Sequence, residues 1–265
     1  MRPTLLTSCY TWELPRGCWK RSRDKGWYNM RLLDLFSGIG GFSLAVQWVW
    51  GDDLEIVSFV EIDPYCQKVL RKHWPNVPIH SDIKSFDSNK YGTVDLITGG
   101  FPCQPFSQAG KQRGKEDDRY LWPEMFRVIK ESRPRWIVGE NVSNIVTMEL
   151  NEMLSDLESE GYEVCPIVVP ACAVEAPHRR DRMWIIANSF SDGAGRIAPL
   201  SFQEGSFLWK SYGIYDSRTW LKTNGGIDRE NDGIPRELDR IKSLGNAIVP
   251  QVAEQIFRAI KEIEE

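Results

Sequence analysis

The chain has 265 residues, of which 42% are hydrophobic and 26% are charged, which fits one large domain or one domain with a small appendage. Its net charge of −4 gives no sign of a polyanionic partner, and no apolar run approaches the length of about 18 residues that a membrane-spanning helix needs. Six scattered cysteines without a Cys-x-x-Cys pair, only three histidines and no signal-peptide pattern argue against a disulfide framework or a metal site, and predict a cytoplasmic, reducing location.

The first 29 residues differ from the rest of the chain. They contain several arginines and lysines and the tryptophans Trp12, Trp19 and Trp27, without a clear period. We expect a poorly ordered extension, or a start site assigned too early. The alternative is a basic and aromatic arm that contacts nucleic acid.

Strand-like and helix-like segments alternate from residue 30 to about residue 187. The apolar runs that predict strands are 32–36, 56–61, 94–98, 136–140 and 183–187. The segments that predict helices are 42–50, 65–73, 121–131, 148–160 and, near the C-terminus, 252–264. This alternation predicts an α/β fold with a mostly parallel, doubly wound, Rossmann-like sheet that carries helices on both faces.

Residues 188–240 interrupt this pattern. They are rich in Gly, Ser, Asp and Arg and lack a strong period, so we expect a small irregular lobe there. The last predicted helix then returns to the first domain, which we expect to comprise residues 30–187 and 241–265.

A glycine-rich turn joins the first predicted strand to the first predicted helix, in the run DLFSGIGGF at residues 34–42. Glycines let a ligand approach the backbone closely, and the N-terminus of the helix offers N–H groups that have no partner within the helix. Ser43 stands where a dinucleotide fingerprint has its third glycine, so the loop alone is a weak signal.

Two acids follow the glycine-rich turn in chain order. Glu61 ends the second predicted strand, where a carboxylate suits a ribose diol. Asp82 can accept a hydrogen bond from an exocyclic amine. Together with the turn, these acids predict an adenosine-containing cofactor.

Cys103 lies in the run GGFPCQPFS at residues 99–107, just after the strand predicted at 94–98. A free cysteine is usually a small buried hydrophobe. The flanking glycines and prolines argue against burial here and favour an exposed nucleophile, whose thiolate form nearby cations would stabilise.

Three charged residues lie at the end of one later strand or just before the start of another. Glu140 ends the strand predicted at 136–140, at the ligand-binding edge of an open α/β sheet, although it could instead cap a helix. Arg180 and Arg182 lead into the strand predicted at 183–187. Because residues two apart on a strand share a face, we expect both guanidinium groups to point at one site; a solvated charge run is the alternative.

The order of these motifs resembles that of the DNA (cytosine-5)-methyltransferase family. The segments that carry the resemblance are FSGIGG (36–41), FPCQ (101–104), ENV (140–142), RDR (180–182) and LGNAIVP (244–250). They are similar, in order, to the family's first cofactor motif, its Pro-Cys-Gln, Glu-Asn-Val and Gln-x-Arg-x-Arg motifs and its last motif. The short region 188–240 resembles the target-recognition lobe of compact phage or prophage members.

This resemblance implies transfer of a methyl group from S-adenosylmethionine to C5 of cytosine in duplex DNA, as in restriction–modification systems, within a bacterial or phage-infected cell. It implies that Cys103 attacks C6 of the base, that Glu140 holds and protonates N3, and that Arg180 and Arg182 orient O2. The base has to leave the stack for this chemistry. We expect the protein to act as a monomer.

The resemblance also implies which residues contact the cofactor. Phe36 would contact the adenine, Glu61 the ribose and Asp82 the adenine amine, while the glycines let the cofactor pass. The full set is Phe36, Ser37, Gly38, Gly40, Gly41, Glu61, Ile62, Asp82, Ile83, Pro102, Asn246 and Ala247.

The segment 106–120 is rich in glycine and basic residues, and we expect a moving loop that meets DNA phosphates, with a plain solvated loop as the alternative. The residues expected to contact DNA, from this segment and just before it, are Gln104, Ser107, Lys111, Arg113 and Arg119.

His178 departs from the family pattern, which usually has Gln at this place. Three alternatives to the DNA enzyme remain open at the level of sequence. They are an RNA cytosine-5 methyltransferase acting on tRNA with the same scaffold, a catalytically weak DNA-binding relative and a nicotinamide-dependent oxidoreductase. The incomplete glycine fingerprint disfavours the last of these.

Overall fold

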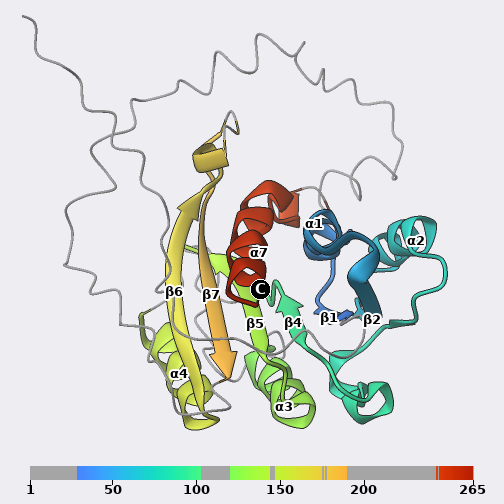
Figure 1. Ribbon diagram of the computed structural model, residues 1–265, viewed down its shortest axis with the longest axis horizontal. Coiled ribbons are helices and arrows are strands. Elements are labelled where there is room, and N and C mark those ends of the chain that lie inside the picture. Colours follow the sequence, from blue (N-terminus) through green and yellow to red (C-terminus); the bar gives the residue numbers. More distant parts are fainter. Residues whose placement is uncertain are drawn as a thin grey trace, which may run out of the picture.

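The computed structural model describes residues 29–102, 120–143, 147–174, 176, 178–189, 243 and 245–264 (Figure 1). Several sequence predictions therefore lie outside the described residues. They concern the segment 1–28, most of the expected lobe at 188–240, and Cys103, Gln104, Ser107, Lys111, Arg113 and Arg119.

Within the described residues, seven strands form one sheet in the order β3-β2-β1-β4-β5-β7-β6. The strands are β1 (Met30–Leu35), β2 (Leu54–Val60), β3 (Ile79–His80), β4 (Leu96–Gly99), β5 (Trp136–Val142), β6 (Tyr162–Pro170) and β7 (Asp181–Ser189). The first five are parallel, whereas β7 is antiparallel to both β5 and β6. The predicted α/β fold with a mostly parallel sheet is confirmed.

The sequence did not predict β3 or β6. β3 has only two residues, too few to show any pattern. β6 lies at the edge of the sheet, is half-buried along most of its length and contains Pro166 and Pro170. An edge strand tolerates proline because only one of its sides is paired, but the prolines and the weak alternation hide the strand in the sequence.

Helices cover both faces of the sheet (Figure 1). In the described part of the chain, the α-helices are α1 (Gly41–Trp50), α2 (Pro64–His73), α3 (Trp122–Ser132), α4 (Thr147–Ser159) and α7 (Pro250–Glu264). α1 and α7 share one hydrophobic cluster with the sheet, and α3 and α4 share the other. All five helices were predicted, with ends that lie within two residues of the observed ones.

α2 begins where a proline and a capping acid follow β2. The Asp63 carboxylate accepts the N–H groups of Tyr65 at 2.8 Å and Cys66 at 3.4 Å. Pro64 occupies the first turn, where its missing N–H costs nothing. This start signal ends the extended chain two residues after Glu61 and so keeps that acid at the tip of β2.

α7 is fixed to the start of α1 by aromatic packing. Phe42 meets Trp184 of β7 edge to face at a centroid distance of 5.9 Å and meets Phe257 of α7 at 6.4 Å. Lys261 also donates a hydrogen bond to the carbonyl of Val49 at 2.9 Å. These contacts bring the residues just before α7 to the glycine-rich loop at the start of α1.

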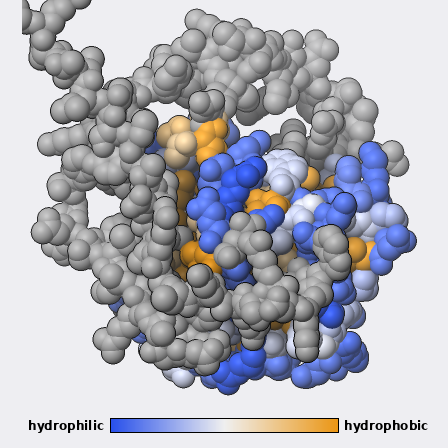
Figure 2. Space-filling view, in the orientation of Figure 1, coloured by the Kyte–Doolittle hydropathy of each residue, from blue (hydrophilic) through white to orange (hydrophobic). Residues whose placement is uncertain are grey.

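The described surface seen in Figure 2 is mostly hydrophilic, with small separate hydrophobic areas. Among the residues that the structure describes, the large exposed apolar side chains are those of Trp48, Ile62, Val142 and Val168. Among the described residues, no helix combines the length and the apolar character that crossing a membrane requires.

Candidate active site

The glycine-rich loop follows β1 at the carboxyl edge of the parallel strands. Phe36, Gly38 and Gly40 have left-handed backbone conformations, with φ of 52°, 55° and 87°. Ser37 Oγ donates to the carbonyl of Asp34 at 2.6 Å, and the Gly40 N–H donates to the Ser37 carbonyl at 2.9 Å. A left-handed backbone is strained for phenylalanine, so the surrounding structure holds this loop in one shape.

The glycines of the loop have different surroundings. A Cβ on Gly38 would have no described heavy atom within 4 Å beyond its own chain neighbours. A Cβ on Gly40 would lie 2.5 Å from the ring of Trp74, and one on Gly41 would lie 2.7 Å from the side chain of Ile248. Packing therefore explains Gly40 and Gly41, whereas Gly38 borders open space in which a ligand has room.

Glu61 ties the glycine-rich loop to the turn after β2. Its Oε2 accepts the Gly38 N–H at 2.7 Å, and its Oε1 accepts the Asp63 N–H at 2.7 Å. The residue is only 8% exposed, and this burial raises the pKa of Glu61, although the N–H groups of Asp63 and Gly38 oppose the change. A carboxylate oxygen accepts more than one hydrogen bond, so both oxygens retain capacity for hydroxyl donors.

The residues after β2 and β3 extend this edge of the sheet. Ile62 is 75% exposed, which is unusual for a large apolar side chain next to a buried acid. Asp82 is exposed and caps a short 3-10 turn, Ile83–Ser85, by accepting the Lys84 N–H at 2.9 Å. Ile83 itself is buried in the hydrophobic core beneath the turn.

This arrangement fits an adenosine group. The open space beside Gly38 leaves room for a ligand close to the backbone. The buried carboxylate of Glu61 suits a ribose diol, and the exposed apolar side chain of Ile62 suits the face of a base. Asp82 adds an exposed hydrogen-bond acceptor at the same edge.

The turn that leads to Cys103 is anchored just before it. Phe101 is 3% exposed and packs against Trp122 at the start of α3, with a centroid distance of 5.5 Å. Asn141 Nδ2 donates to the Phe101 carbonyl at 3.3 Å, which links the end of β5 to this turn. Pro102 is exposed, so the chain reaches the surface immediately after its buried anchor.

Glu140 and Arg182 form an ion pair beside this turn. Arg182 Nε lies 2.9 Å from Glu140 Oε1, and a Cβ on Gly100 would lie 3.7 Å from Glu140 Oε2. Glu140 is 8% exposed. Burial raises the pKa of Glu140, while the charges of Arg182 and Arg180 act in the opposite direction. Strand pairing explains the contact, because antiparallel β7 places Arg182 opposite Val142 at the end of β5.

Arg180 does not lie on the strand, so the prediction that Arg180 and Arg182 share a strand face is wrong. Arg180 precedes β7 and has a left-handed backbone with φ of 38°. Its Nη2 donates to the carbonyls of Gly245 at 2.9 Å and Ala247 at 2.7 Å. Arg180 therefore joins the start of β7 to the loop before α7, and it still acts electrostatically on Glu140.

A buried acid, Asp34, lies beneath the glycine-rich loop. It is fully buried, and its two oxygens accept hydrogen bonds from Ser43 Oγ at 2.7 Å and Thr98 Oγ1 at 2.8 Å. Burial raises the pKa of Asp34 to about 7, against the effect of these hydroxyl donors. Because its partners lie on α1 and β4, Asp34 connects three elements below the site.

A comparison with known families decides the class of this site. The sequence model of the family described as C-5 cytosine-specific DNA methylase matches residues 30–202. The chain belongs to this family. The match covers the glycine-rich loop, Glu140 and the two arginines, so the methylase family and the geometry point to one site.

Individual methylases resemble the chain over part of their length. The type II methyltransferase M1.ScrFI of Lactococcus lactis is 36% identical over 182 residues, which are 66% of this chain and 46% of that protein. The orphan methyltransferase M.Rho11sI of Bacillus phage rho11s is 30% identical over 215 residues, which are 72% of this chain and 42% of that protein. The chain spans less than half the length of these two methylases.

Solved structures confirm the methyltransferase fold. A prophage-encoded protein from E. coli, described as a DNA modification methyltransferase, aligns with a TM-score of 0.52 and 27% identity over 61% of this chain and 47% of that one. The Dnmt2 methyltransferase of S. pombe aligns with a TM-score of 0.53 and 24% identity over 62% of this chain and 52% of that one.

The sequence did not assign roles to two residues of this methylase site. Asp34 is part of the glycine-rich run, and Asn141 is part of the Glu-Asn-Val run, but their contacts join distant parts of the chain. The signal that could have found them is a polar residue at the end of an otherwise apolar strand. His178 and Asn246 are exposed, and Ala247 is half-buried beside Arg180.

Proposed function

We propose that the protein transfers a methyl group from S-adenosylmethionine to C5 of cytosine in duplex DNA. The observation that carries this proposal is the ion pair between buried Glu140 and half-buried Arg182 beside Gly100, three residues before Cys103. A buried acid next to a nucleophile serves a reaction in which a ring nitrogen must be held and protonated. Membership of the C-5 cytosine-specific DNA methylase family supports the choice of cytosine and of DNA.

C5 of cytosine is too weak a nucleophile to be methylated directly. Addition of the Cys103 thiolate to C6 moves the electrons of the C5–C6 double bond toward C5, which then behaves as an enamine carbon. Once C5 carries the methyl group, loss of its proton and cleavage of the C6–S bond restore the aromatic ring. The turn bearing Cys103 needs a fixed position for this attack, and the buried Phe101 and its Asn141 contact supply an anchor two residues away.

Glu140 acts at N3, which lies across the pyrimidine ring from C6, the atom that the thiolate attacks. Thiolate addition at C6 places negative charge on N3, and a protonated carboxyl group can donate to this atom. Burial raises the pKa of Glu140, so the group holds a proton more readily than an exposed glutamate. Arg182 orients the carboxyl group through the 2.9 Å contact of its Nε, and its Nη1 donates to the Asp181 carbonyl at 2.9 Å. The N–H groups of its Nη2 would serve O2 of the base.

S-adenosylmethionine supplies an electrophilic methyl group to this site. Glu61 would hold the ribose hydroxyls, Asp82 the adenine amine and Ile62 the face of the adenine, with Gly38 leaving room for the remainder of the molecule. The edge that carries these residues also carries Glu140, because β1, β2, β4 and β5 are parallel.

Bisulfite sequencing of plasmid DNA from cells that express the chain, beside cells that express Cys103→Ser, tests the proposal. We expect protected cytosines within one short sequence for the parent protein and none for the variant, because serine is a much poorer nucleophile toward C6. The tRNA of the same cells is sequenced in parallel.

Protection of tRNA with unmodified plasmid DNA would overturn the DNA assignment in favour of the RNA enzyme. Equal protection by the parent protein and by Cys103→Ser would overturn the covalent mechanism. Folded parent protein that protects neither nucleic acid would contradict the proposed activity as a whole.

A further inference from the structure

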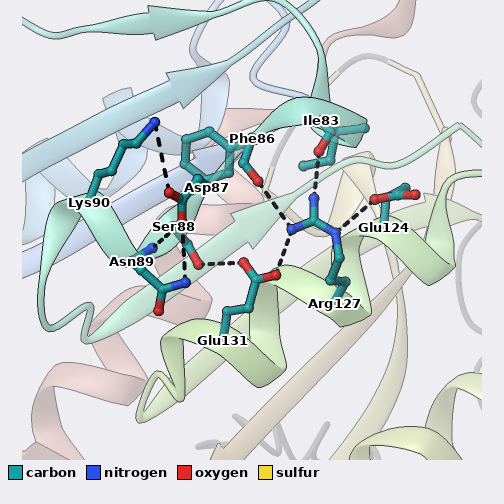
Figure 3. A network of polar contacts seen from close by, with 9 residues as sticks. All are labelled: Ile83, Phe86, Asp87, Ser88, Asn89, Lys90, Glu124, Arg127 and Glu131. Atoms are coloured by element: carbon teal, nitrogen blue, oxygen red, sulfur yellow. Dashed lines mark hydrogen bonds and ion pairs between the residues drawn. The ribbon is translucent and has the colours of Figure 1, made fainter.

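Arg127, on α3, forms the centre of a polar network that the proposed reaction does not use (Figure 3). Its Nη2 donates to the Ile83 carbonyl at 2.7 Å, and its Nη1 donates to the Phe86 carbonyl at 3.1 Å. Glu124 and Glu131, on the same helix, accept from its Nε at 3.0 Å and its Nη1 at 2.7 Å. The guanidinium group thus joins α3 to two carbonyls on a segment about 40 residues earlier in the chain.

The two carbonyls belong to the turn that carries Asp82. The turn runs from Ile83 to Ser85, the Phe86 N–H donates to the Ile83 carbonyl at 3.2 Å, and Asp82 caps the turn through Lys84. β3 has only two residues and ends at His80, so the chain has already left the sheet when it reaches Asp82 and the turn. Arg127 therefore fixes the part of the turn that the sheet does not reach.

Two carboxylates hold the guanidinium group of Arg127 in place. Burial lowers the pKa of Arg127, but the hydrogen bonds and charges of Glu131 and Glu124 outweigh this effect, and the net pKa is raised. The second oxygen of Glu131 accepts from Ser88 Oγ at 2.9 Å, so the same acid also holds the chain beyond the turn. A planar guanidinium group can bridge two carbonyls and two carboxylates at once, which a lysine cannot do.

α3 also contacts the turn that leads to Cys103. Trp122, at its start, packs against Phe101 and donates from Nε1 to Asp156 of α4 at 2.8 Å. The helix is thus held at one end beside the nucleophile turn, while Arg127 reaches from its middle to the Asp82 turn. α3 therefore contacts both the segment that leads to Cys103 and the turn that carries Asp82.

We propose that Arg127 is a positioning residue for the cofactor, which holds the turn 83–86 so that the Asp82 carboxylate meets the amine of the adenine. This inference rests on the proposed function, because it assumes that S-adenosylmethionine binds at this edge. Arg127 acts through the turn and does not itself touch the cofactor.

The test measures binding of S-adenosylhomocysteine by calorimetry, without DNA, for the parent protein, Arg127→Lys and Asp82→Asn. We expect Arg127→Lys to weaken binding by about 10- to 100-fold, because a small displacement of a positioned group has effects of this size. We also expect the double variant Arg127→Lys/Asp82→Asn to bind no more weakly than Asp82→Asn. Both changes would remove the same interaction, that of the Asp82 carboxylate with the adenine amine.

A ligand with a different base separates positioning from general damage. The hypoxanthine analogue of S-adenosylhomocysteine lacks the amine that Asp82 would accept. We expect the parent protein to prefer adenine to hypoxanthine, and Arg127→Lys to lose most of this preference. In steady-state assays the same variant should raise the KM for S-adenosylmethionine while kcat changes much less.

Arg258→Lys on α7 is the matched control. Arg258 Nε and Nη2 contact Glu254, four residues earlier, at 2.9 and 2.6 Å, much as Arg127 contacts Glu131 four residues later. The contacts of Arg258 with Glu254 stay within α7, whereas those of Arg127 reach the turn. We expect this control to bind like the parent protein. Glu131→Gln provides a second test with Arg127 still present, and we expect a smaller loss of the same base preference.

Unchanged affinity and base preference in folded Arg127→Lys would overturn the inference while leaving the proposed function intact. Additive losses in the double variant would also overturn it. A parent protein that binds no S-adenosylhomocysteine would contradict the proposed function itself, and the inference would be lost with it.

Discussion

At the scale of the residue, two opposing effects on the pKa of Glu140 set the protonation of its carboxyl group. Burial raises the pKa of Glu140, and the charges of Arg182 and Arg180 lower it. The catalytic form in the proposed reaction is the protonated one, since it donates to N3 of cytosine. The pH range of activity therefore depends on the arginines as well as on burial.

Replacement of Arg182 by glutamine tests this dependence. Removing the cation raises the pKa of Glu140 further, so the carboxyl group stays protonated to higher pH. We expect the basic limb of the pH–rate profile to move to higher pH, while the maximal rate falls by about 100-fold because Glu140 and the base lose a positioned donor. The rate of methyl transfer, measured at saturating cofactor over the pH range that includes the basic limb, gives both quantities.

Arg179→Gln is the control for this experiment, because Arg179 pairs with Asp181 at 2.9 Å and its side chain is 58% exposed. It should leave the profile unchanged. A basic limb that stays in place, or moves to lower pH, in Arg182→Gln would contradict the assigned role of protonated Glu140.

At the scale of the element, the start of α1 is determined by packing as much as by ligand binding. Gly40 is the N-cap of α1, and its missing side chain allows Trp74 to approach. Trp74 is itself held by the ring of Phe59 at 5.5 Å and by a hydrogen bond to Gln47 at 3.3 Å. The indole therefore has little freedom to move aside.

Alanine at position 40 should destabilise the fold, whereas alanine at position 38 should mainly affect ligand binding. Both glycines have left-handed backbones, so each substitution costs about 1 to 2 kcal/mol of backbone strain. Gly40→Ala adds the clash with Trp74, and we expect a total loss of about 3 kcal/mol or more in the free energy of unfolding.

Urea denaturation of both variants measures this difference. Gly38→Ala serves as the matched control, since it has the same strain without the clash. We expect it to be the more stable variant and to bind S-adenosylhomocysteine more weakly than the parent protein. Equal losses of stability would mean that Trp74 moves freely and that packing does not explain Gly40.

The regular elements could be predicted because their signals are local. The helix from Gly41 to Trp50 and the strand from Trp136 to Val142 show their apolar patterns within a few residues, and their predicted ends are nearly those observed. The antiparallel direction of β7 could not be predicted, because it depends on the β6 strand beside it, which has no clear pattern.

The residues of the site, too, could be predicted only where their sequence signal is local. Cys103, Glu140 and Glu61 could be proposed because each lies at or just after the end of a predicted strand, in a recognisable run. The Arg127 network could not, since an arginine on a helix surface has the same sequence signature whether it meets solvent or a carbonyl more than 40 residues away. The position of Arg180 was misjudged because the left-handed residue before β7 breaks the alternation on which the prediction relied.

At the scale of the whole molecule, Asp34 makes stability depend on pH. The pKa of this acid rises from 3.8 to about 7 on folding because it is fully buried. The folded state therefore binds the proton more tightly than the unfolded state. Its contribution to stability is fully present below about pH 4 and is lost as the pH rises through about 7.

Asp34→Asn should remove this dependence, because the amide stays neutral. We expect the free energy of unfolding of the parent protein to fall relative to that of the variant by up to about 4 kcal/mol between pH 4 and pH 8, from the size of the pKa change. Urea denaturation at a series of pH values gives the difference directly. Asp52→Asn, at an exposed acid, is the control.

A constant difference between Asp34→Asn and the parent protein across this range would show that Asp34 has the same pKa in both states. A difference that grows in favour of the parent protein would show that its hydroxyl partners Ser43 and Thr98 hold the ionised form.

The direction of β7 determines where the chain can vary. Because β7 is antiparallel to β5, it starts beside Glu140 and ends at Ser189, whose N–H donates to the Arg135 carbonyl at 2.9 Å on the opposite edge of the sheet. The chain returns to the site edge at Ala247, where Arg180 holds it. Both junctions are thus secured by contacts that involve none of the intervening residues. Changes of sequence or length in the segment between them can therefore leave Glu140, Arg182 and the loop before α7 in the same relative positions.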